Sequence, residues 1–270
     1  LLIVYGTDLV LLLLIGKVPL AYNFRYLWVR RRDTALTAVA FTVVVALVVV
    51  LLAFVNGMYR LNEATGVPGN VLVMSEGSTD ELGTFGPDGK FAKLPADAPR
   101  DVPGAEYLHS YESYIVMNQA VPPKPGESPK RRFVQMRAFQ DVRLASAVHN
   151  IDLEPGGKWF SGAGVEPGTK APDGLEYLQC CIGEGAAATL GEDAGKPRLA
   201  VGDTFELGDR WWKVIGLMRT RGTTYGSEVW VPVENPVVRA TGKGDKFTTL
   251  VLRMADDSDT SARAMAYHLN

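Results

Sequence analysis

The sequence is poor in the residues that usually mark a disulfide framework or a metal site. It has only two cysteines, Cys180 and Cys181, and three histidines, His109, His149 and His268. Adjacent cysteines rarely bond each other, because the ring would be strained, so we expect both thiols to be buried small residues of an apolar strand. The histidines are far apart and have no metal-ligating partner at a useful spacing. We therefore predict no metal site.

Catalytic motifs are also missing. The sequence has no G-x-S-x-G elbow and no H-E-x-x-H motif. Residues 191–196 superficially resemble a phosphate-binding loop, but the two glycines are one residue too close and Pro197 stands where Ser or Thr is required. Acidic pairs such as Asp80 and Glu81 lie in polar loops, as do Asp256 and Asp257, where solvated charge is the simplest explanation. We predict that the chain is not an enzyme and itself holds no catalytic residue, no cofactor and no ATP.

Neither sign of charge is in excess. The chain carries 28 Lys and Arg against 30 Asp and Glu, a formal net charge of −2 at pH 7. A nucleic-acid-binding protein usually shows a marked basic excess, so this balance gives no support to a nucleic-acid partner.

What the sequence does contain is a long apolar run at residues 34–59, which includes no charged residue. About 20 apolar residues cross a bilayer as a helix. Residues 41–54 are apolar on every face, whereas a helix on the surface of a soluble protein has one polar side. The many Val residues would favour a strand in water, but in lipid the backbone must satisfy its own hydrogen bonds, which requires a helix. We predict a transmembrane helix at residues 34–58; the alternative is a buried helix of a large soluble protein.

Charges beside this run predict its orientation. The segment before it is strongly basic and the segment after it is not, and short basic flanks stay on the cytoplasmic side. Residues 59–270 should therefore lie outside the cytoplasm, with the chain in the cell inner (cytoplasmic) membrane and in contact with lipid. The flanking basic residues before the run are Lys17, Arg25, Arg30, Arg31 and Arg32, against Asp33.

Two shorter segments precede the transmembrane run. Residues 1–16 are mostly apolar and are interpreted as the end of a membrane helix, with an interfacial or signal-like segment as the alternative. Residues 17–33 are basic and amphipathic, because Leu20, Phe24, Leu27 and Trp28 recur at helical spacing. This pattern is typical of a helix on the cytoplasmic membrane surface. It serves equally well as a simple anchor or as a surface for a cytoplasmic partner.

Residues 59–270 alternate strand-like and loop-like passages, which predicts an α+β fold of mixed α/β elements. Gly208 and Asp209 form a tight-turn signal between two strands. A short helix should follow residue 182 and stop at Gly191, and another helix should begin near Asp259. We expect the natural protein to continue past Asn270. The expected strands are residues 70–74, 114–117, 132–137, 178–182, 201–207, 210–218, 228–233 and 248–254.

The order of these parts resembles the N-terminal half of an ABC transporter permease of the MacB/FtsX type. Residues 135–137 and 153–160 (QMR and LEPGGKWF) are similar to the family passage v-x-G … l-x-x-G-R-W-F. Residues 182–191 (IGEGAAATLG) resemble its i-G-x-x-l-A-x-x-L-G helix, and residues 201–216 its v-G-d-x-i … f-x-V-v-G hairpin. The departures are Ala138 where Gly is common, a Pro-rich insertion near Pro122, and the absent second half.

This resemblance implies a permease subunit with a MacB-like periplasmic core domain, truncated before its C-terminal membrane helices. In such systems a separate cytoplasmic ATPase binds and hydrolyses ATP, and the motion reaches the outer domain for export or mechanotransmission. The implied partners are that ATPase, a second permease subunit in a homodimer or heterodimer, and a periplasmic adaptor in some members. Arg25, Arg30, Arg31 and Arg32 would then set topology and lie near the ATPase.

Other functions remain open from the sequence. A membrane-anchored binding or sensor module without transport activity would also show apolar helices and a sizeable outer domain. A third interpretation is an anchored hydrolase whose nucleophile the motifs do not reveal. The transported substrate or regulated partner has no signature in the sequence.

Overall fold

The computed structural model describes residues 20–82, 108–122, 126, 128, 130–242, 247–254 and 258–269. The chain divides into two units, Leu1–Tyr59 and Arg60–Asn270. The predicted segment at residues 1–16, the residues Lys17 and Asn270, and the acidic pair Asp256 and Asp257 lie outside the described residues.

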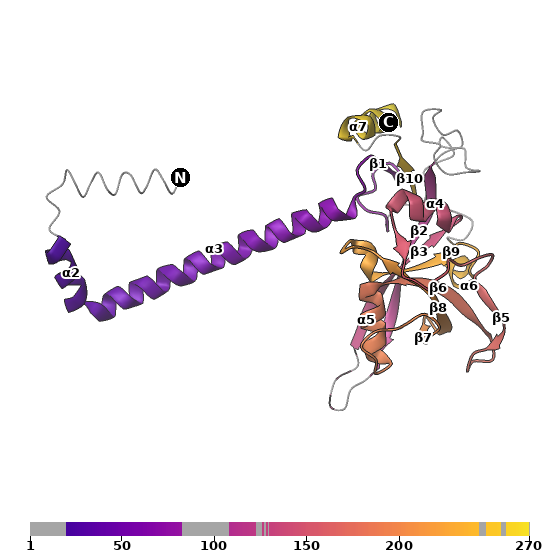
Figure 1. Cartoon of the computed structure of the whole chain (residues 1–270), viewed down its shortest axis with the longest axis horizontal. Helices are drawn as coiled ribbons and strands as arrows, with labels where there is room; N and C mark the ends of the chain where they lie inside the picture. The colour runs from indigo at the N-terminus through magenta and orange to yellow at the C-terminus, as the bar shows by residue number, and fades with distance from the viewer. Residues whose placement is uncertain are drawn as a thin grey trace. The chain divides into compact units, whose positions relative to one another are not determined.

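The described part of the first unit consists of helix α2 (Leu20–Val29) and most of helix α3 (Arg31–Thr65) (Figure 1). Among the described residues, α3 is the one helix long and apolar enough to cross a membrane, over Arg31–Arg60. Its apolar side chains are exposed in the structure, which does not fit the core helix of a soluble protein. The helix continues past both ends of the predicted 34–58 segment. The exact domain limits stay a prediction.

Two threonine hydroxyls inside α3 are satisfied within the helix. The hydroxyls of Thr37 and Thr42 donate to the carbonyl oxygens of Asp33 and Ala38 at 2.9 and 2.8 Å. Such bonds four residues back along the helix are what an apolar environment requires, because no water is present there to accept them.

In the described residues, the second unit is built on one ten-stranded sheet with the order β1-β10-β2-β3-β9-β6-β8-β4; β5 pairs with β6 and β7 with β8. Two pairs are parallel, β3 with β9 and β6 with β8, and all others are antiparallel. The strands are β1 (Asn70–Val73), β2 (His109–Val121), β3 (Lys130–Phe139), β4 (Asp152–Leu153), β5 (Val165–Lys170), β6 (Glu176–Gly183), β7 (Thr204–Leu207), β8 (Arg210–Arg219), β9 (Glu228–Pro232) and β10 (Thr249–Arg253).

Short helices cover this sheet. Helix α4 packs on β2 and β10, α5 on β6, β8 and β9, and α7 on β1. This mixed architecture confirms the predicted α+β fold class. The helices are α4 (Val142–His149), α5 (Glu184–Asp193), α6 (Pro236–Ala240) and α7 (Asp259–Leu269), with the 3-10 helix η2 (Thr224–Ser227).

The predicted turn at Gly208 and Asp209 and the predicted helix end at Gly191 had different outcomes. The tight turn between β7 and β8 is confirmed: Gly208 and Asp209 both have positive φ, 61° and 57°, as a type I′ turn requires. The predicted end of α5 at Gly191 is wrong, because the helix continues to Asp193. Gly191 is needed there for close packing instead, since a Cβ atom would lie 2.6 Å from the Cα of Arg198.

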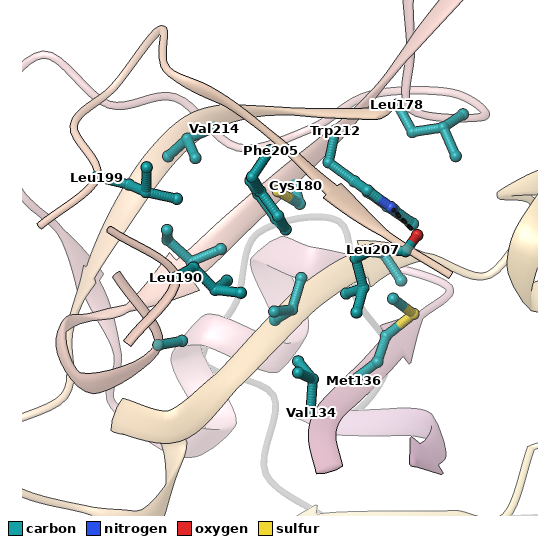
Figure 2. Packing of buried hydrophobic residues seen from close by; sticks show 14 of the residues in the cluster. Val134, Met136, Leu178, Cys180, Leu190, Leu199, Phe205, Leu207, Trp212 and Val214 are labelled. Carbon is teal, nitrogen blue, oxygen red and sulfur yellow. Dashed lines mark hydrogen bonds between the residues drawn. The ribbon is translucent and has the colours of Figure 1, made fainter. Parts of the chain in front are cut away.

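The sheet has an apolar core on each face. One core contains the β3 side chain Met136 and the β8 side chain Trp212, whose Nε1 donates to the Leu207 carbonyl oxygen at 2.9 Å (Figure 2). The other contains Phe139 and Trp230. Cys180 belongs to the first core and Cys181 to the second, because successive residues of a strand point to opposite faces. Both thiols are free and buried, as predicted.

A substitution at Gly183 tests how closely η2 approaches the end of β6. A Cβ atom at Gly183 would lie 2.4 Å from the carbonyl oxygens of Tyr225 and Gly226, which are backbone atoms and cannot rotate away. We expect Gly183→Ala to lower the free energy of unfolding by about 1–3 kcal/mol. Chemical denaturation of the full-length protein in detergent measures this change.

Gly185→Ala is the matched control. Its Cβ atom would approach the same Gly226 oxygen at 3.1 Å, in the first turn of α5, where Ala is a better helix former than Gly by about 1 kcal/mol. This variant should be close to neutral. Equal stability of the two variants would contradict the described packing.

Candidate functional site: a buried charge cluster

Arg137 is the centre of a cluster of ionisable side chains inside the second unit. Only 4% of its side chain is exposed. Its Nε and Nη2 donate to the Glu228 carboxylate at 3.0 and 2.9 Å, and Nη1 donates to Glu112 at 2.8 Å. Nη1 and Nη2 also donate to the two oxygens of Glu81, both at 2.8 Å. A guanidinium has five N–H donors, so these five bonds use all of them.

Strand register brings the two most buried carboxylates to Arg137. In the antiparallel β2–β3 pair, Arg137 lies opposite Tyr114, so Glu112, two residues earlier on β2, is on the same face. In the parallel β3–β9 pair, Arg137 lies opposite Trp230, and Glu228 is likewise two residues earlier. The side-chain period of two thus places one carboxylate on each side of the guanidinium.

His149 extends the cluster. Its Nε2 lies 2.5 Å from an oxygen of Glu112, and its Nδ1 lies 2.8 Å from the Tyr225 hydroxyl. His149 is the last residue of α4, which ends because Asn150 adopts a left-handed conformation with φ of 52°. Trp230 closes the other side, since its Nε1 donates to Glu228 at 2.9 Å. The cluster therefore joins β2, β3, β9, α4 and η2.

The cluster favours the charged forms of Glu112 and Arg137. Burial alone would raise the pKa of Glu112, but His149 and Arg137 outweigh it and lower that pKa to about 2. Burial likewise opposes the charge of Arg137, yet Glu228 and the other carboxylates raise its pKa well above the ordinary value. Burial raises the pKa of the Tyr225 hydroxyl, which therefore stays protonated at neutral pH.

A pocket of about 420 Å³ opens beside the cluster. Arg137, Glu81, His149 and Tyr225 contribute to its wall, together with Asn70 at the start of β1. The Asn70 amide nitrogen donates to the Val148 carbonyl oxygen at 2.9 Å. Its buried Oδ1 accepts no hydrogen bond from the described residues. The pocket thus combines an arginine with an acceptor that has no partner there.

The groups of this cluster are suited to holding neighbouring strands together and to binding a ligand. Its carboxylates are paired and its tyrosine stays protonated, so neither provides an activated nucleophile. Burial raises the pKa of the Cys181 thiol to about 12 and that of Cys180 well above its ordinary value, so neither is a reactive thiolate. In the described part of the chain, no group of three His, Cys, Asp or Glu residues could hold a metal ion.

The residues that the sequence predicted for topology and ATPase coupling lie in the first unit. Arg25 is on α2, Arg30 follows it, and Arg31 and Arg32 begin α3; all four are exposed. The guanidinium of Arg30 lies 4.9 Å from the centre of the Tyr26 ring. Exposure leaves these side chains free for headgroups or a partner, and their role stays a prediction.

The sequence interpretation of Glu81 as solvated charge is wrong. Its carboxylate pairs with Arg137, and 24% of the side chain is exposed. The local polar sequence gave no indication of this contact, because Arg137 is 56 residues away. A usable signal existed elsewhere: Arg137 and Glu112 are charged residues within otherwise strand-like sequence, and buried charges require partners. His149, interpreted only as lacking a metal partner, is also part of the cluster.

The fold and site together define an α+β domain that follows an apolar helix of membrane-spanning length. The family model described as the MacB-like periplasmic core domain matches residues 34–266. The chain belongs to this family. This confirms the resemblance to ABC transporter permeases of the MacB/FtsX type, which are transporter components and not classical enzymes.

Several solved structures are similar to this chain, and two of them are transporter domains. One is the periplasmic region of MacB from Actinobacillus actinomycetemcomitans, with 11% identity and a TM-score of 0.46; the match covers 77% of this chain and 85% of that one. The other is the extracellular domain of the noncanonic ABC-type transporter YknZ from Gram-positive bacteria, with 13% identity and a TM-score of 0.39, covering 73% and 88%. No curated protein matches the chain.

Acid titration tests the electrostatic role of Glu112. Its pKa is about 2 in the folded chain against an ordinary value of 4.5, so as the pH falls the unfolded chain takes up the proton first. The stabilisation is complete above about pH 4.5 and is lost towards pH 2. It amounts to about 3 kcal/mol. The free energy of unfolding, measured from pH 7 to pH 2, should therefore fall steeply.

Glu112→Gln is the comparison that isolates this group. The variant should be less stable than the original protein at pH 7, because Arg137 and His149 lose a charged partner. Its stability should then decline less between pH 4.5 and pH 2. Parallel pH profiles for the two proteins would contradict the low pKa of Glu112.

Proposed function

We propose that this chain is part of the permease subunit of an ABC transporter in the cytoplasmic (inner) membrane. A separate cytoplasmic ATPase binds and hydrolyses ATP, and the resulting helix motion moves the extracytoplasmic domain for export or mechanotransmission. The observation that carries this proposal is that one family model spans both the apolar run and the outer domain, residues 34–266. A domain that merely borrowed the fold would not need that helix.

The charge pattern supports the orientation in this proposal. Arg25, Arg30, Arg31 and Arg32 precede the apolar run, and all are exposed. Basic residues within short flanks remain in the cytoplasm. Residues 59–270 then lie outside, and the arginines lie on the side of the membrane where an ATPase has access to ATP.

The short link after the apolar helix supports mechanical coupling. Helix α3 ends at Thr65 and β1 begins at Asn70. Four residues therefore lie between them, and the five Cα–Cα steps from Thr65 to Asn70 span at most about 18 Å even when fully extended. The backbone N–H of Asn70 donates to the Val67 carbonyl oxygen at 3.0 Å, so part of this link is a turn. A connection this short would transmit most of a displacement of the helix to the sheet.

The cluster around Arg137 supports motion of the outer domain as one body. It fixes three neighbouring strands to α4 and η2 through buried charge-assisted hydrogen bonds, which are stronger than neutral ones. A domain that is cross-linked in this way transmits a displacement instead of absorbing it.

Purification of the full-length protein from its native membranes tests the proposal. The preparation should contain an ABC ATPase in stoichiometric amount, should hydrolyse ATP, and should include a second permease subunit, which is either a second copy or a related chain. A preparation that contains neither an ATPase nor ATP hydrolysis would contradict the permease function and favour a membrane-anchored sensor.

Neutral substitution of the basic flank tests its role. We expect the combined change of Arg30, Arg31 and Arg32 to Gln to reduce the amount of ATPase that copurifies, or to invert the orientation of the helix. Protease accessibility of the outer domain in spheroplasts and in inverted vesicles reports orientation, while quantitative mass spectrometry reports assembly.

Arg60→Gln is the matched control, because it removes an exposed arginine from the opposite end of the same apolar run. It should change neither orientation nor assembly. Normal orientation and normal ATPase content in the Arg30, Arg31 and Arg32 variant would refute the proposed role of these residues.

A further inference from the structure

The three carboxylates around Arg137 are held in unequal ways. Glu112 and Glu228 are strand residues whose side chains are 0% and 3% exposed. Glu81 comes from the irregular segment that follows β1, and 24% of its side chain is exposed. Among the described residues, the only hydrogen bonds found for Glu81 are the two that its carboxylate accepts from Arg137. Glu81 is therefore the exchangeable member of the cluster.

The geometry of the Arg137–Glu81 contact is that of ligand recognition. One N–H from Nη1 and one from Nη2 reach separate oxygens of the same carboxylate at 2.8 Å. This bidentate arrangement is how arginine selects a carboxylate over a single-point anion. The remaining donors of Arg137 are tied to Glu112 and Glu228, so the guanidinium plane is fixed before Glu81 binds. A guanidinium that is already held in place loses little conformational entropy when it binds a ligand.

The pocket gives a ligand access to the Nη1–Nη2 edge of Arg137. Glu81 and Arg137 both line it, and its volume of about 420 Å³ exceeds that of one carboxylate group. The Asn70 Oδ1 atom in the same wall is buried and lacks a donor among the described residues. A ligand with an N–H beside its carboxylate would pair the carboxylate with Arg137 and donate the N–H to Asn70 Oδ1. The second bond would be favourable, because a buried acceptor without a partner is costly.

We propose that the Nη1–Nη2 edge of Arg137 is a carboxylate-binding site, filled in this structure by Glu81 and open to a carboxylate ligand when Glu81 is displaced. Glu81 acts as a tethered occupant, which has the advantage of high effective concentration over any free acid. This site is independent of ATPase coupling, since it rests on contacts inside the second unit alone.

Chemical rescue of a Glu81 variant tests the site. Glu81→Ala in the full-length protein leaves the Nη1–Nη2 edge of Arg137 unoccupied. The melting temperature of this variant should be lower than that of the original protein. Added acetate, titrated against chloride at constant pH and ionic strength, should raise the melting temperature of this variant in a saturable way. A rise of about 2–4 °C near saturation is expected for a domain of this size. The original protein should not respond, because Glu81 fills the site.

Three controls make the result specific. Glu76→Ala removes an exposed carboxylate from the same segment and should show no response to acetate. Acetamide has the size of acetate but no charge and should leave the Glu81→Ala protein unchanged. N-acetylglycine, which adds an amide N–H to the carboxylate, should stabilise the variant more than acetate does if Asn70 takes part. If it matches acetate, the site recognises the carboxylate alone.

The proposal fails if acetate does not stabilise the Glu81→Ala protein, or if chloride, acetamide or the Glu76→Ala control gives the same rise. Should Glu81→Ala not fold, Glu81→Gln replaces it, because the amide keeps the side-chain volume but loses the negative charge. A specific rise with acetate in that variant supports the site, and its absence overturns the proposal.

Discussion

The structure of the second unit depends on one physical constraint: the guanidinium of Arg137 is buried, so each of its N–H donors must have an acceptor. Removing a charge from water costs several kcal/mol, and only well-placed partners recover that cost. Here the partners come from β2, β9 and the segment after β1, and one of them leads on to His149 and Tyr225. One side chain thereby fixes the register of three strands and the position of two helices.

This constraint connects the fold to the proposed function. Four residues separate the apolar helix from the first strand of the sheet, and the cluster holds β2, β3 and β9 to α4 and η2. In the proposed function, a displacement of the helix would act on a domain whose strands and helices are cross-linked by this cluster. Glu81 is the exchangeable contact of the proposed carboxylate site, so a carboxylate ligand would act at the place where the segment after β1 is held to the sheet.

Local features could be predicted from the sequence, and long-range ones could not. The apolar helix, the turn at Gly208 and Asp209, and the helix that begins at Asp259 follow from patterns within a few residues. The charge cluster joins Arg137 to Glu228, which is 91 residues away, and no local pattern specifies that pairing. The same limit explains two errors: Glu81 lies in a polar loop yet pairs with Arg137, and Gly191 packs against Arg198 within a continuing helix. The family resemblance supplied the architecture but not this site.

A double-mutant cycle between Arg137 and Glu228 tests the central role of the cluster most directly. Free energies of unfolding are measured at pH 7 for the original protein, Arg137→Met, Glu228→Gln and the double variant. Each single change leaves a buried charged or polar partner uncompensated, and Arg137→Met should cost about 3–5 kcal/mol. We predict that the double variant loses less than the sum of the single losses, by about 1–3 kcal/mol. Additive losses, equal within about 0.5 kcal/mol, would contradict the account.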